Sequence, residues 1–419
     1  MKVLVVGSGG REHAVVDALA HSSKVTKVFA APGNGGMGEE AELVPISADD
    51  LEELASFARA ERVDITFVGP ELPLSKGLVD IFRAQGMPVI GPTADQARLE
   101  SSKSFAKRFF KSNGIPTATF DECYTPAEAY NVLEKSRYPV VIKADGLAAG
   151  KGVVIAECPD EARGAVQSFM ETKTLGEAGT RLVIEEFLEG EEASFHVFAD
   201  GLVFQPMVAA QDHKRRFDGD TGPNTGGMGA YSVDTILSKG EYEAVLNHII
   251  KPTLGAAQSY SGILYAGLML TSDGPKLLEY NARFGDPETQ VILSRLKTDL
   301  IDIFVDMVEH RLSGRRLEWR TDAAATVVLV SREYPGKVES GKEIRGLEAA
   351  KRVDGVKVYH AGTRAEGGKI YTNGGRVLNV TARGGTLAEA LDRAYSVVQM
   401  IEFEGKDYRR DIGKKGLGK

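Results

Sequence analysis

The stretch KLLEYNARFGDPE carries three polar side chains at two-residue spacing, Glu279, Asn281 and Arg283. In a β-strand these three share one face, and Leu278 and Tyr280 point to the other. A carboxylate and an amide oxygen are ligands that Mg²⁺ prefers, and the same ion also takes phosphate oxygens. A neighbouring guanidinium would stabilise the charge of a transferring phosphoryl group. The pattern therefore predicts a metal-assisted phosphoryl-transfer site, with a solvated polar face as the alternative.

A second candidate site is the glycine-rich loop of YPVVIKADGLAAGKGVVI, which joins two apolar, β-branched runs. Lys143 lies on the first run and Lys151 in the loop, so both would reach the same space. The loop is not a Walker A motif, because only three residues separate Gly146 and Gly150. Gly152 also follows the second lysine, where a magnesium-binding hydroxyl would be needed. We expect instead a flexible β-hairpin that folds over a triphosphate.

The N-terminal loop GSGGREH follows an apolar run and opens a helical pattern, a place where backbone amides bind phosphate. The dinucleotide fingerprint would need a third glycine at position 12, but that residue is Glu12. It would also need an acidic residue at the end of the second strand, but that strand ends in FAAPGN. A nicotinamide cofactor is therefore not expected. Phosphate binding by Gly9, Gly10 and Arg11 is expected, unless the loop is only a tight strand–helix turn.

Two further polar segments are candidate binding sites. The segment VIEEFLEGEE could present backbone groups to an adenine edge while Glu191 accepts hydrogen bonds from ribose hydroxyls, although a charged strand end explains it too. The segment QDHKRRFDGDTGPNTGGMGAYS is a glycine-rich loop of about twenty residues without helix or strand signals, and such loops are usually functional. Its Asp212, His213 and Lys214 predict a substrate and phosphate loop. His213 is not needed as a general base, since an amine nucleophile can lose its proton to a carboxylate.

Composition limits the classes of protein that the chain can belong to. A length of 419 residues favours two to four domains. A net charge of -8 argues against nucleic-acid and anionic-membrane binding, both of which need a basic surface. Cys123 and Cys158 lack metal-ligand spacing, which indicates structural thiols and a reduced, cytoplasmic compartment. No signal peptide and no apolar segment of about 20 residues, the length of a membrane span, is found.

The elements that must position these residues show two different patterns along the sequence. Over the first hundred residues, four apolar runs (KVLVV, VTKVFAAPGN, DITFVGPE and MPVIGPT) alternate with three helical patterns (REHAVVDALAHS, DDLEELASFARAERV and PLSKGLVDIFRAQG). This alternation predicts a parallel sheet with helices on both faces and ligands at the carboxyl ends of its strands. Later segments mix helix and hairpin signals, including a hairpin with an SDG turn, and predict an α+β region with antiparallel pairs.

In this order, the motifs resemble the ATP-grasp superfamily and, within it, the family of glycinamide ribonucleotide synthetases, also called phosphoribosylamine–glycine ligases. The similarity runs nearly end to end and is most specific in QDHKRRFDGDTGPNTGGMGAY. Other shared segments are GSGGREHA, APGNGG, VGPELPLSKGLVD, LESSKSFAK, NARFGDPETQ, TNGGRVLNVTA and YRRDIG. The chain departs from the family at Tyr280, where Phe is usual, and in SREYPGKVESG, which is more charged than the family's Gly-Gly-Tyr-Pro-Gly form.

The resemblance implies an N-terminal parallel α/β domain in residues 1–101 and an ATP-grasp domain in residues 102–320, with a mobile nucleotide-covering subdomain at about 120–190. A small mixed α/β domain would follow in residues 321–419. The implied activity ligates glycine to 5-phosphoribosylamine through glycyl phosphate, giving glycinamide ribonucleotide, ADP and phosphate in de novo purine biosynthesis. It implies ATP with Mg²⁺ or Mn²⁺ as cofactors, and a cytoplasmic monomer whose partners are its small substrates, without nucleic acid or membrane.

The resemblance also implies a role for each matching residue. The expected ATP-binding residues are Lys103, Lys143, Gly150, Lys151, Gly152, Glu185, Phe187, Leu188 and Glu191. The expected metal ligands are Glu279 and Asn281, and the expected phosphoribosylamine-binding residues are Gly9, Gly10, Arg11, Asn34 and Glu71. Catalytic roles at the reacting carboxylate are expected for Arg283, Lys143, Asp212 and Lys214.

Three other functions remain open on the sequence alone. An ATP-grasp ligase acting on formate or bicarbonate would show the same motifs and would release ADP with those acids rather than with glycine. A nicotinamide-dependent oxidoreductase could be built on the N-terminal alternation, but the fingerprint is incomplete. A non-catalytic nucleotide sensor would have no turnover for a Glu279→Gln substitution to abolish.

Overall fold

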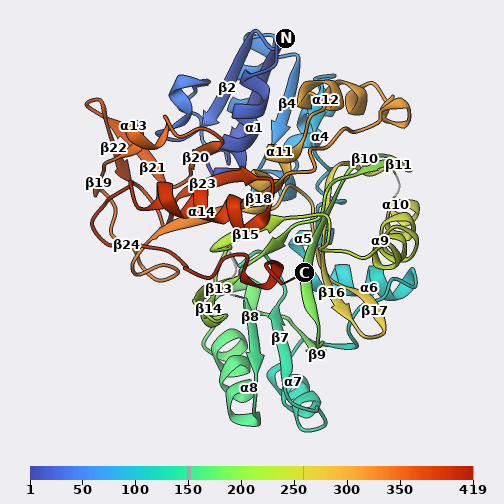
Figure 1. Cartoon of the computed structure of the whole chain (residues 1–419). Coiled ribbons are helices and arrows are strands. Elements are labelled where there is room, and N and C mark those ends of the chain that lie inside the picture. Colours follow the sequence, from blue (N-terminus) through green and yellow to red (C-terminus); the bar gives the residue numbers. More distant parts are fainter. Residues whose placement is uncertain (149–151, 258, 419) are drawn as a thin grey trace.

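The computed structural model describes residues 1–148, 152–257 and 259–418, and its first hundred residues form a parallel sheet (Figure 1). The strand order is β3-β2-β1-β4-β5, and every pairing is parallel. The strands are β1 (Lys2–Gly7), β2 (Lys27–Pro32), β3 (Glu42–Leu43), β4 (Ile65–Val68) and β5 (Val89–Ile90). The predicted parallel α/β domain is confirmed. The chain reverses its direction of winding between β1 and β4, which opens a crevice at their carboxyl ends.

Helices cover both faces of this sheet because its strands are apolar on both sides. Val3 and Val5 of β1 pack with α1 (Gly10–Ala20), whereas Leu4 and Val6 pack with α2 (Leu51–Ala60) and α4 (Leu78–Ala84). The helix expected at PLSKGLVDIFRAQG is two helices, because Gly77 adopts φ 88 and separates α3 (Glu71–Ser75) from α4. A left-handed residue cannot continue a right-handed helix.

A four-stranded antiparallel sheet of order β6-β9-β7-β8 projects at the bottom of Figure 1, flanked by α7 and α8. Its elements are β6 (Phe120–Cys123), α7 (Pro126–Leu133), β7 (Val140–Ala144), β8 (Val153–Ala156), α8 (Pro159–Val166) and β9 (Leu182–Glu186). β7 and β8 pair antiparallel, which confirms the hairpin predicted around the glycine-rich loop. Gly150 and Lys151 of that segment lie outside the described residues.

A second antiparallel sheet, of order β11-β10-β16-β17, contains the polar strand β17 at one edge. Its strands are β10 (Glu191–Asp200), β11 (Val203–Pro206), β16 (Ser261–Thr271) and β17 (Gly274–Asn281). The same part of the molecule includes the helices α5 (Arg98–Ser101), α6 (Lys103–Ser112), α9 (Lys239–Val245) and α10 (Lys251–Ala256). The expected alternation along β17 is wrong at one place. The pairing slips between Gly267 and Leu268, so Leu277 joins Tyr280 in the core while Leu278 lines the same cavity as Glu279.

The third sheet combines strands from the middle and the end of the chain in the order β12-β15-β18-β23-β20. Its strands are β12 (Gln211–Asp212), β15 (Gly229–Ser232), β18 (Ala323–Ser331), β20 (Val356–His360), β23 (Arg376–Gly384) and β24 (Lys406–Asp407), which pairs with β18. α11 (Glu288–Arg295), α13 (Leu347–Ala350) and α14 (Leu387–Val398) pack against this sheet, whereas α12 (Leu300–Val308) packs near the N-terminal sheet and β10. A small sheet is formed by β19 (Glu343–Ile344), β21 (Thr363–Glu366) and β22 (Lys369–Thr372). The antiparallel pairing of β15 with β18 joins the strands from the middle of the chain to those from its C-terminal part.

The segment predicted as a loop without strands, residues 211–232, instead contains four. β12 and β15 pair with each other, and β13 (Arg215–Phe217) pairs with β14 (Thr221–Asn224) as a hairpin. Glycines and polar residues dominate these strands, so the sequence shows no strand pattern there, and pairing with distant segments stabilises them.

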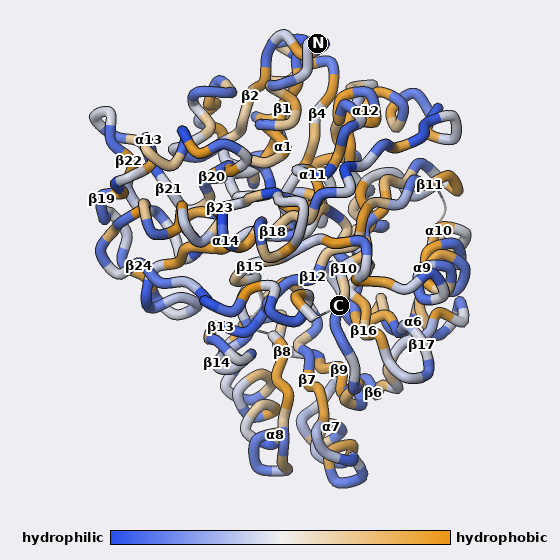
Figure 2. Tube along the Cα trace, viewed as in Figure 1, coloured by the Kyte–Doolittle hydropathy of each residue, from blue (hydrophilic) through white to orange (hydrophobic). Residues whose placement is uncertain are grey.

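In Figure 2 apolar residues follow the central strands, while outer helix turns are hydrophilic. None of the helices in the described ranges has the length and apolar character that crossing a membrane requires.

Candidate active site

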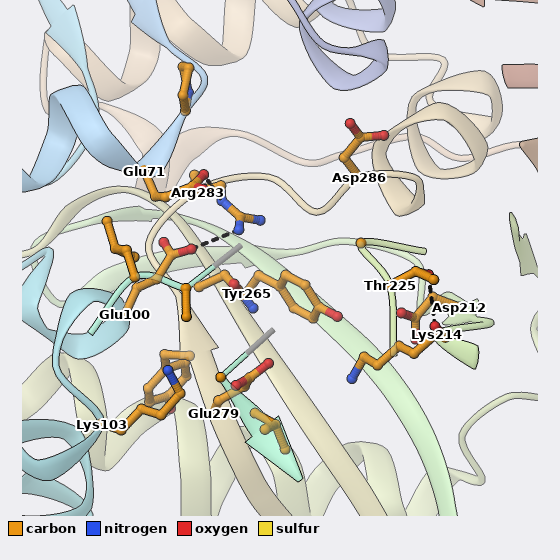
Figure 3. Close-up of a pocket in the computed structure, with 18 of the residues that line it drawn as sticks. Glu71, Glu100, Lys103, Asp212, Lys214, Thr225, Tyr265, Glu279, Arg283 and Asp286 are labelled. Carbon is orange, nitrogen blue, oxygen red and sulfur yellow. Dashed lines mark hydrogen bonds and ion pairs between the residues drawn. The ribbon is translucent and has the colours of Figure 1, made fainter. Parts of the chain in front are cut away.

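A cavity of about 700 Å³ is lined by residues from the N-terminal loops, both antiparallel sheets and the C-terminal part (Figure 3). It brings together most of the residues predicted from the sequence to form the site. Those that line it are Gly9, Arg11, Glu71, Lys103, Lys143, Gly152, Glu185, Asp212, Lys214, Glu279, Asn281 and Arg283. A set of charges this dense in one enclosed space suits a polyanionic ligand with a cation.

Asn34 and Gly10 do not line the cavity. The side-chain amide of Asn34 donates to the carbonyls of Ser8 (2.9 Å) and His360 (2.8 Å), and its oxygen accepts from Gly36 N (3.0 Å). This buried side chain therefore joins the N-terminal loops to the C-terminal part. Gly10 lies against Asn379, so close that an added Cβ would be 2.2 Å from the amide nitrogen. Both residues shape the walls and do not face the cavity.

The residues expected to hold adenosine separate into two groups. Glu185, at the end of β9, faces the cavity. Phe187, Leu188 and Glu191 follow it and are not among the lining residues; Leu188 is buried against a small apolar cluster, and Glu191 borders a shallow groove beside α9. Their adenosine-binding role stays a prediction.

Glu279 and Asn281 offer two oxygen ligands at the end of β17. Within the described part of the chain, neither side chain makes a hydrogen bond or ion pair of its own. Burial alone would raise the pKa of Glu279, but the surrounding lysine ammonium groups, Lys214 most strongly, hold it below its usual value. The carboxylate is therefore ionised, and this donor set fits Mg²⁺ or Mn²⁺.

Two lysines pair with one carboxylate of the cavity lining, and a third lysine lies near them. Glu185 accepts ion pairs from Lys107 (2.8 Å) and Lys143 (2.9 Å), and Lys103 donates to the Gly146 carbonyl (3.1 Å). Burial lowers the pKa of Lys107 to about 8, against the attraction of Glu185. The sequence reasoning missed Lys107, although its i, i+4 spacing from Lys103 on α6 places both on one helix face.

Arg283 follows the end of β17 and is positioned by carboxylates from the N-terminal third of the chain. Its guanidinium contacts Glu71 (3.2 Å) and Glu100 (2.7 Å). The dashed line in Figure 3 marks the contact with Glu100. Arg283 holds the pKa of Glu71 at about 2, whereas burial raises the pKa of Glu100. Glu71, expected to bind phosphoribosylamine, therefore pairs with an arginine that follows the predicted metal ligands in the chain. Glu100 was not predicted.

Asp212 and Lys214 line the cavity beside a buried network of hydroxyl and carboxyl groups. Tyr265 Oη donates to Glu288 Oε1 (2.6 Å), and Ser194 Oγ donates to the same oxygen (3.1 Å). Burial raises the pKa of Asp212 to about 8, Lys214 opposes the shift, and Glu288 adds to it. Asp212 therefore keeps its proton near neutral pH, beside the Lys214 ammonium. Tyr265 and Glu288 were also missed, since the strand and helix that bring them together are distant in sequence.

His213 is buried outside the cavity. Its Nε2 accepts a hydrogen bond from Gly413 N (3.2 Å), and burial lowers its pKa to about 4. The structure thus gives the imidazole a packing role in the loop, in agreement with the expectation that it is no general base.

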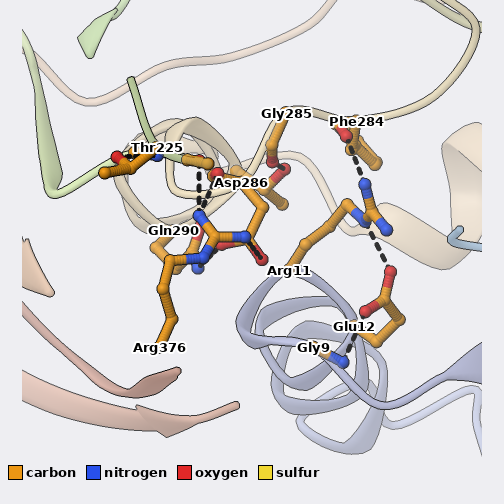
Figure 4. A network of polar contacts seen from close by, with 12 residues as sticks. Gly9, Arg11, Glu12, Thr225, Phe284, Gly285, Asp286, Gln290 and Arg376 are labelled. Atoms are coloured by element: carbon orange, nitrogen blue, oxygen red, sulfur yellow. Dashed lines mark hydrogen bonds and ion pairs between the residues drawn. The ribbon is translucent and has the colours of Figure 1, made fainter. Parts of the chain in front are cut away.

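Two further arginines that line the cavity belong to a network of polar contacts (Figure 4). Arg11 pairs with Glu12 and donates to the Phe284 carbonyl (2.9 Å). Arg376 pairs with Asp286 (3.0 Å) and donates to the Gly226 carbonyl (2.6 Å). Arg376 was not predicted as a site residue, although it belongs to the TNGGRVLNVTA segment. The cavity lining therefore includes two arginines from the N-terminal and C-terminal parts of the chain, in addition to Arg283 and the lysines.

Comparison with known proteins supports this geometry along the whole chain. Models of the phosphoribosylglycinamide synthetase family match its N domain at residues 1–100, its ATP-grasp (A) domain at residues 101–289 and its C domain at residues 324–415. A phosphoribosylamine–glycine ligase of Halalkalibacterium halodurans is 48% identical over 423 residues, covering 100% of this chain and 97% of that protein. The corresponding ligase of Chlorobaculum tepidum is 49% identical over 425 residues and is covered completely.

Solved structures agree with the sequence relatives. The crystal structure of phosphoribosylamine–glycine ligase from Thermotoga maritima has a TM-score of 0.83 at 35% identity, covering 98% of this chain and 100% of that one. A biotin carboxylase from Campylobacter jejuni has a TM-score of 0.76 at 14% identity, covering 97% and 92%, and shares the fold. The chain belongs to the phosphoribosylamine–glycine ligase family, the ATP-grasp ligases of purine biosynthesis.

Proposed function

We propose that the chain uses ATP to join the carboxylate of glycine to the amine of 5-phosphoribosylamine through glycyl phosphate. The observation that carries this proposal is the convergence, in one cavity, of the Glu279 carboxylate, the Asn281 amide oxygen, Arg283 and the lysines of α6 and β7. A carboxylate does not acylate an amine in water, because its oxygen is a poor leaving group. Phosphorylation converts that oxygen into a good one.

The two steps balance without a further reactant. A carboxylate oxygen of glycine attacks the γ-phosphorus of ATP, the bond to the bridging oxygen breaks, and ADP leaves. The amine of phosphoribosylamine then attacks the acyl carbon of glycyl phosphate, inorganic phosphate leaves, and the amine loses a proton. Both the acyl phosphate and the ribosylamine react with water, so an enclosed cavity favours the second step over hydrolysis.

Lys103, Lys143 and Lys107 would bind the phosphates of ATP, with Glu185 fixing two of the ammonium groups. Glu279 and Asn281 would hold Mg²⁺ or Mn²⁺, which draws phosphate oxygens together and offsets their charge. The described part of the β7–β8 hairpin supports this arrangement, since Leu147, Ala148 and Gly152 line the cavity opposite the metal ligands. Small side chains there allow the backbone to approach the phosphates closely.

Glycine would lie between the metal ligands and the loop of residues 211–232. Arg283 would orient the reacting carboxylate, and its own position is fixed by Glu71 and Glu100. The glycine ammonium would lie near Asp212 and Glu288, whose carboxyl oxygens line that wall and would accept its hydrogen bonds. Phosphoribosylamine would occupy the far end, with Gly9 at the start of α1, Arg11 and Arg376 available to its phosphate.

We propose that the chain acts as a monomer, since residues from its N-terminal, middle and C-terminal parts all line the described cavity. Light scattering after size-exclusion chromatography should then give a mass near 45.1 kDa. A dimer whose dissociation abolishes turnover would contradict this part of the proposal.

The proposal is tested by measuring ADP release with ATP, Mg²⁺, glycine and freshly generated phosphoribosylamine. We expect release to require both substrates, and mass spectrometry to detect glycinamide ribonucleotide in equal amount. ADP release that requires formate or bicarbonate in place of glycine would reject the proposal in favour of another carboxylate–amine ligase. Absence of turnover with any acid would favour a nucleotide sensor.

A further inference from the structure

We propose that Arg409 is a positioning residue, through which the C-terminal segment of residues 406–416 fixes the glycine-binding loop of residues 211–232. The inference rests on the proposed function in one respect, the assignment of glycine to that loop. Arg409 itself is not among the residues that line the cavity. It belongs to the YRRDIG segment, to which the catalytic chemistry gives no role.

The guanidinium of Arg409 joins the hairpin β13–β14 to the chain terminus. Its side chain is 1% exposed. Nη1 donates to Asp220 Oδ1 (2.8 Å) and to the Arg215 carbonyl (3.1 Å), both on the hairpin. Nε and Nη2 donate to the two carboxylate oxygens of Asp411, each at 2.8 Å. Such a bidentate pair fixes the plane of the guanidinium, and with it the direction of the two remaining bonds.

Backbone groups of the two segments add contacts around this ion pair. Gly219 N donates to Asp411 Oδ2 (2.8 Å), and Arg410 N donates to Asp218 Oδ1 (2.8 Å). Gly413 N donates to His213 Nε2 (3.2 Å), at the cavity end of the loop. Residues 409–413 therefore contact the hairpin turn and the base of the loop together.

The hairpin is in turn coupled to the residues that face the cavity. Thr225 closes the hairpin on Lys214, with its backbone N and its Oγ1 both donating to the Lys214 carbonyl (2.8 and 2.7 Å). Thr225, Gly226 and Lys214 all line the cavity. A displacement of the hairpin would therefore move Lys214 and the neighbouring Asp212 relative to Arg283.

The outer face of the hairpin has a second anchor that would keep the fold intact when the first is removed. Arg216 donates to the Tyr334 carbonyl (2.7 Å) and pairs with Asp407 (2.7 Å). β15 pairs with β18 along four residues at the end of the loop. Loss of Arg409 should thus loosen the loop without unfolding the sheet.

The test compares Arg409→Met with Arg409→Lys and with the control Arg410→Met, whose side chain is exposed on the same segment. For Arg409→Met we expect the KM for glycine to rise at least tenfold and the KM for ATP to change less than twofold. Arg409→Lys should restore part of the difference, since it keeps the charge and loses the bidentate geometry. Arg410→Met should match the parent chain.

Hydrogen exchange of the ligand-free protein tests the positioning role independently of catalysis. Amides of residues 211–232 should exchange faster in Arg409→Met, and those of β7–β9 should not. Unchanged exchange in this loop, or a parallel rise of both KM values, would overturn the inference. If the parent chain shows no glycine-dependent turnover, the proposed function fails, whereas the exchange result still decides whether Arg409 holds the loop.

Discussion

Glu279 is a cavity carboxylate whose charge is offset by surrounding lysines and by Arg283, and within the described residues its oxygens make no hydrogen bond or ion pair. We predict that Glu279→Gln lowers kcat at least about a hundredfold, because an amide nitrogen replaces one metal-binding oxygen and the local charge changes by one unit. Steady-state ADP release measures the loss, and Glu52→Gln on the exposed face of α2 is the matched control. A Glu279→Gln variant as active as the control would exclude metal binding at this strand.

Glu185 lies between two buried ammonium groups, so its charge is needed for the fold as well as for the nucleotide. We predict that Glu185→Gln destabilises the protein by about 3 kcal/mol, the cost typical of leaving one partner of a buried pair uncompensated. Thermal unfolding should show a lower midpoint, and ATP should bind more weakly because the lysines lose their orientation.

The double variant Glu185→Gln/Lys107→Met is the control for this explanation. Removing one of the two lysines restores the charge balance, so the double variant should be more stable than the single one. If the loss of stability in the double variant equalled the sum of the losses in Glu185→Gln and Lys107→Met, Glu185 would act by packing alone.

At the scale of elements, the approach of Gly227 to Pro287 sets the distance between the loop of residues 211–232 and α11. Gly227 has φ 113, and an added Cβ would be 2.4 Å from the Pro287 ring. We predict that Gly227→Ala reduces turnover more than tenfold, because the loop must move away from the end of the cavity. Glycine-dependent ADP release measures this effect.

Gly274→Ala is the control, since Gly274 has a similar φ of 106 but open space around it. That variant should lose only the cost of backbone strain, about 1–3 kcal/mol of stability, and keep its turnover. Equal losses of activity in both variants would mean that strain, and not the contact with Pro287, explains the effect.

The sequence predicted elements well where local pattern and tertiary structure agree. The parallel sheet, the β7–β8 hairpin and the SDG turn of β16–β17 follow from alternation and turn residues, and each is confirmed. The strands β13 and β14 were missed because glycine and charged residues dominate them and their stability comes from the distant C-terminal segment. The slip between β16 and β17 has no local signal either, and it changes which leucine faces the cavity.

At the scale of the whole molecule, the composition of the cavity could be predicted better than its connections. Residue types and motifs predicted that Glu279, Asn281, the lysines and Arg283 belong to one site, and all of them that the structure describes line the cavity. They could not predict that Glu71 and Glu100 hold Arg283, or that Arg376 joins the same cavity, because these contacts span about half the chain or arise from separate sheets. Such pairings follow from packing of the three sheets, which no short window of sequence contains.

The packing of the sheets also buries His196, His213 and His360, and this makes the fold sensitive to acid. Burial lowers their pKa values to about 3, 4 and 3, whereas the unfolded imidazole titrates near 6.5. Between these values the unfolded chain binds protons that the folded chain does not. Stability is therefore complete above about pH 6.5 and falls as pH falls through this window, by up to about 1.4 kcal/mol per unit for each histidine.

His213→Asn isolates one of these contributions, because asparagine offers an acceptor to Gly413 N but takes up no proton. Between pH 7 and 5 the variant should lose about 2 kcal/mol less unfolding free energy than the parent chain, as measured by denaturant midpoints at the two pH values. The comparison cancels the opposite contribution of Asp212, whose raised pKa favours the folded state at lower pH. The exposed His248→Asn is the control, since its ring is exposed to water in the folded chain too. If His213→Asn lost as much stability as the parent chain, the imidazole would have to be protonated within the fold, and its contact with Gly413 N could not exist.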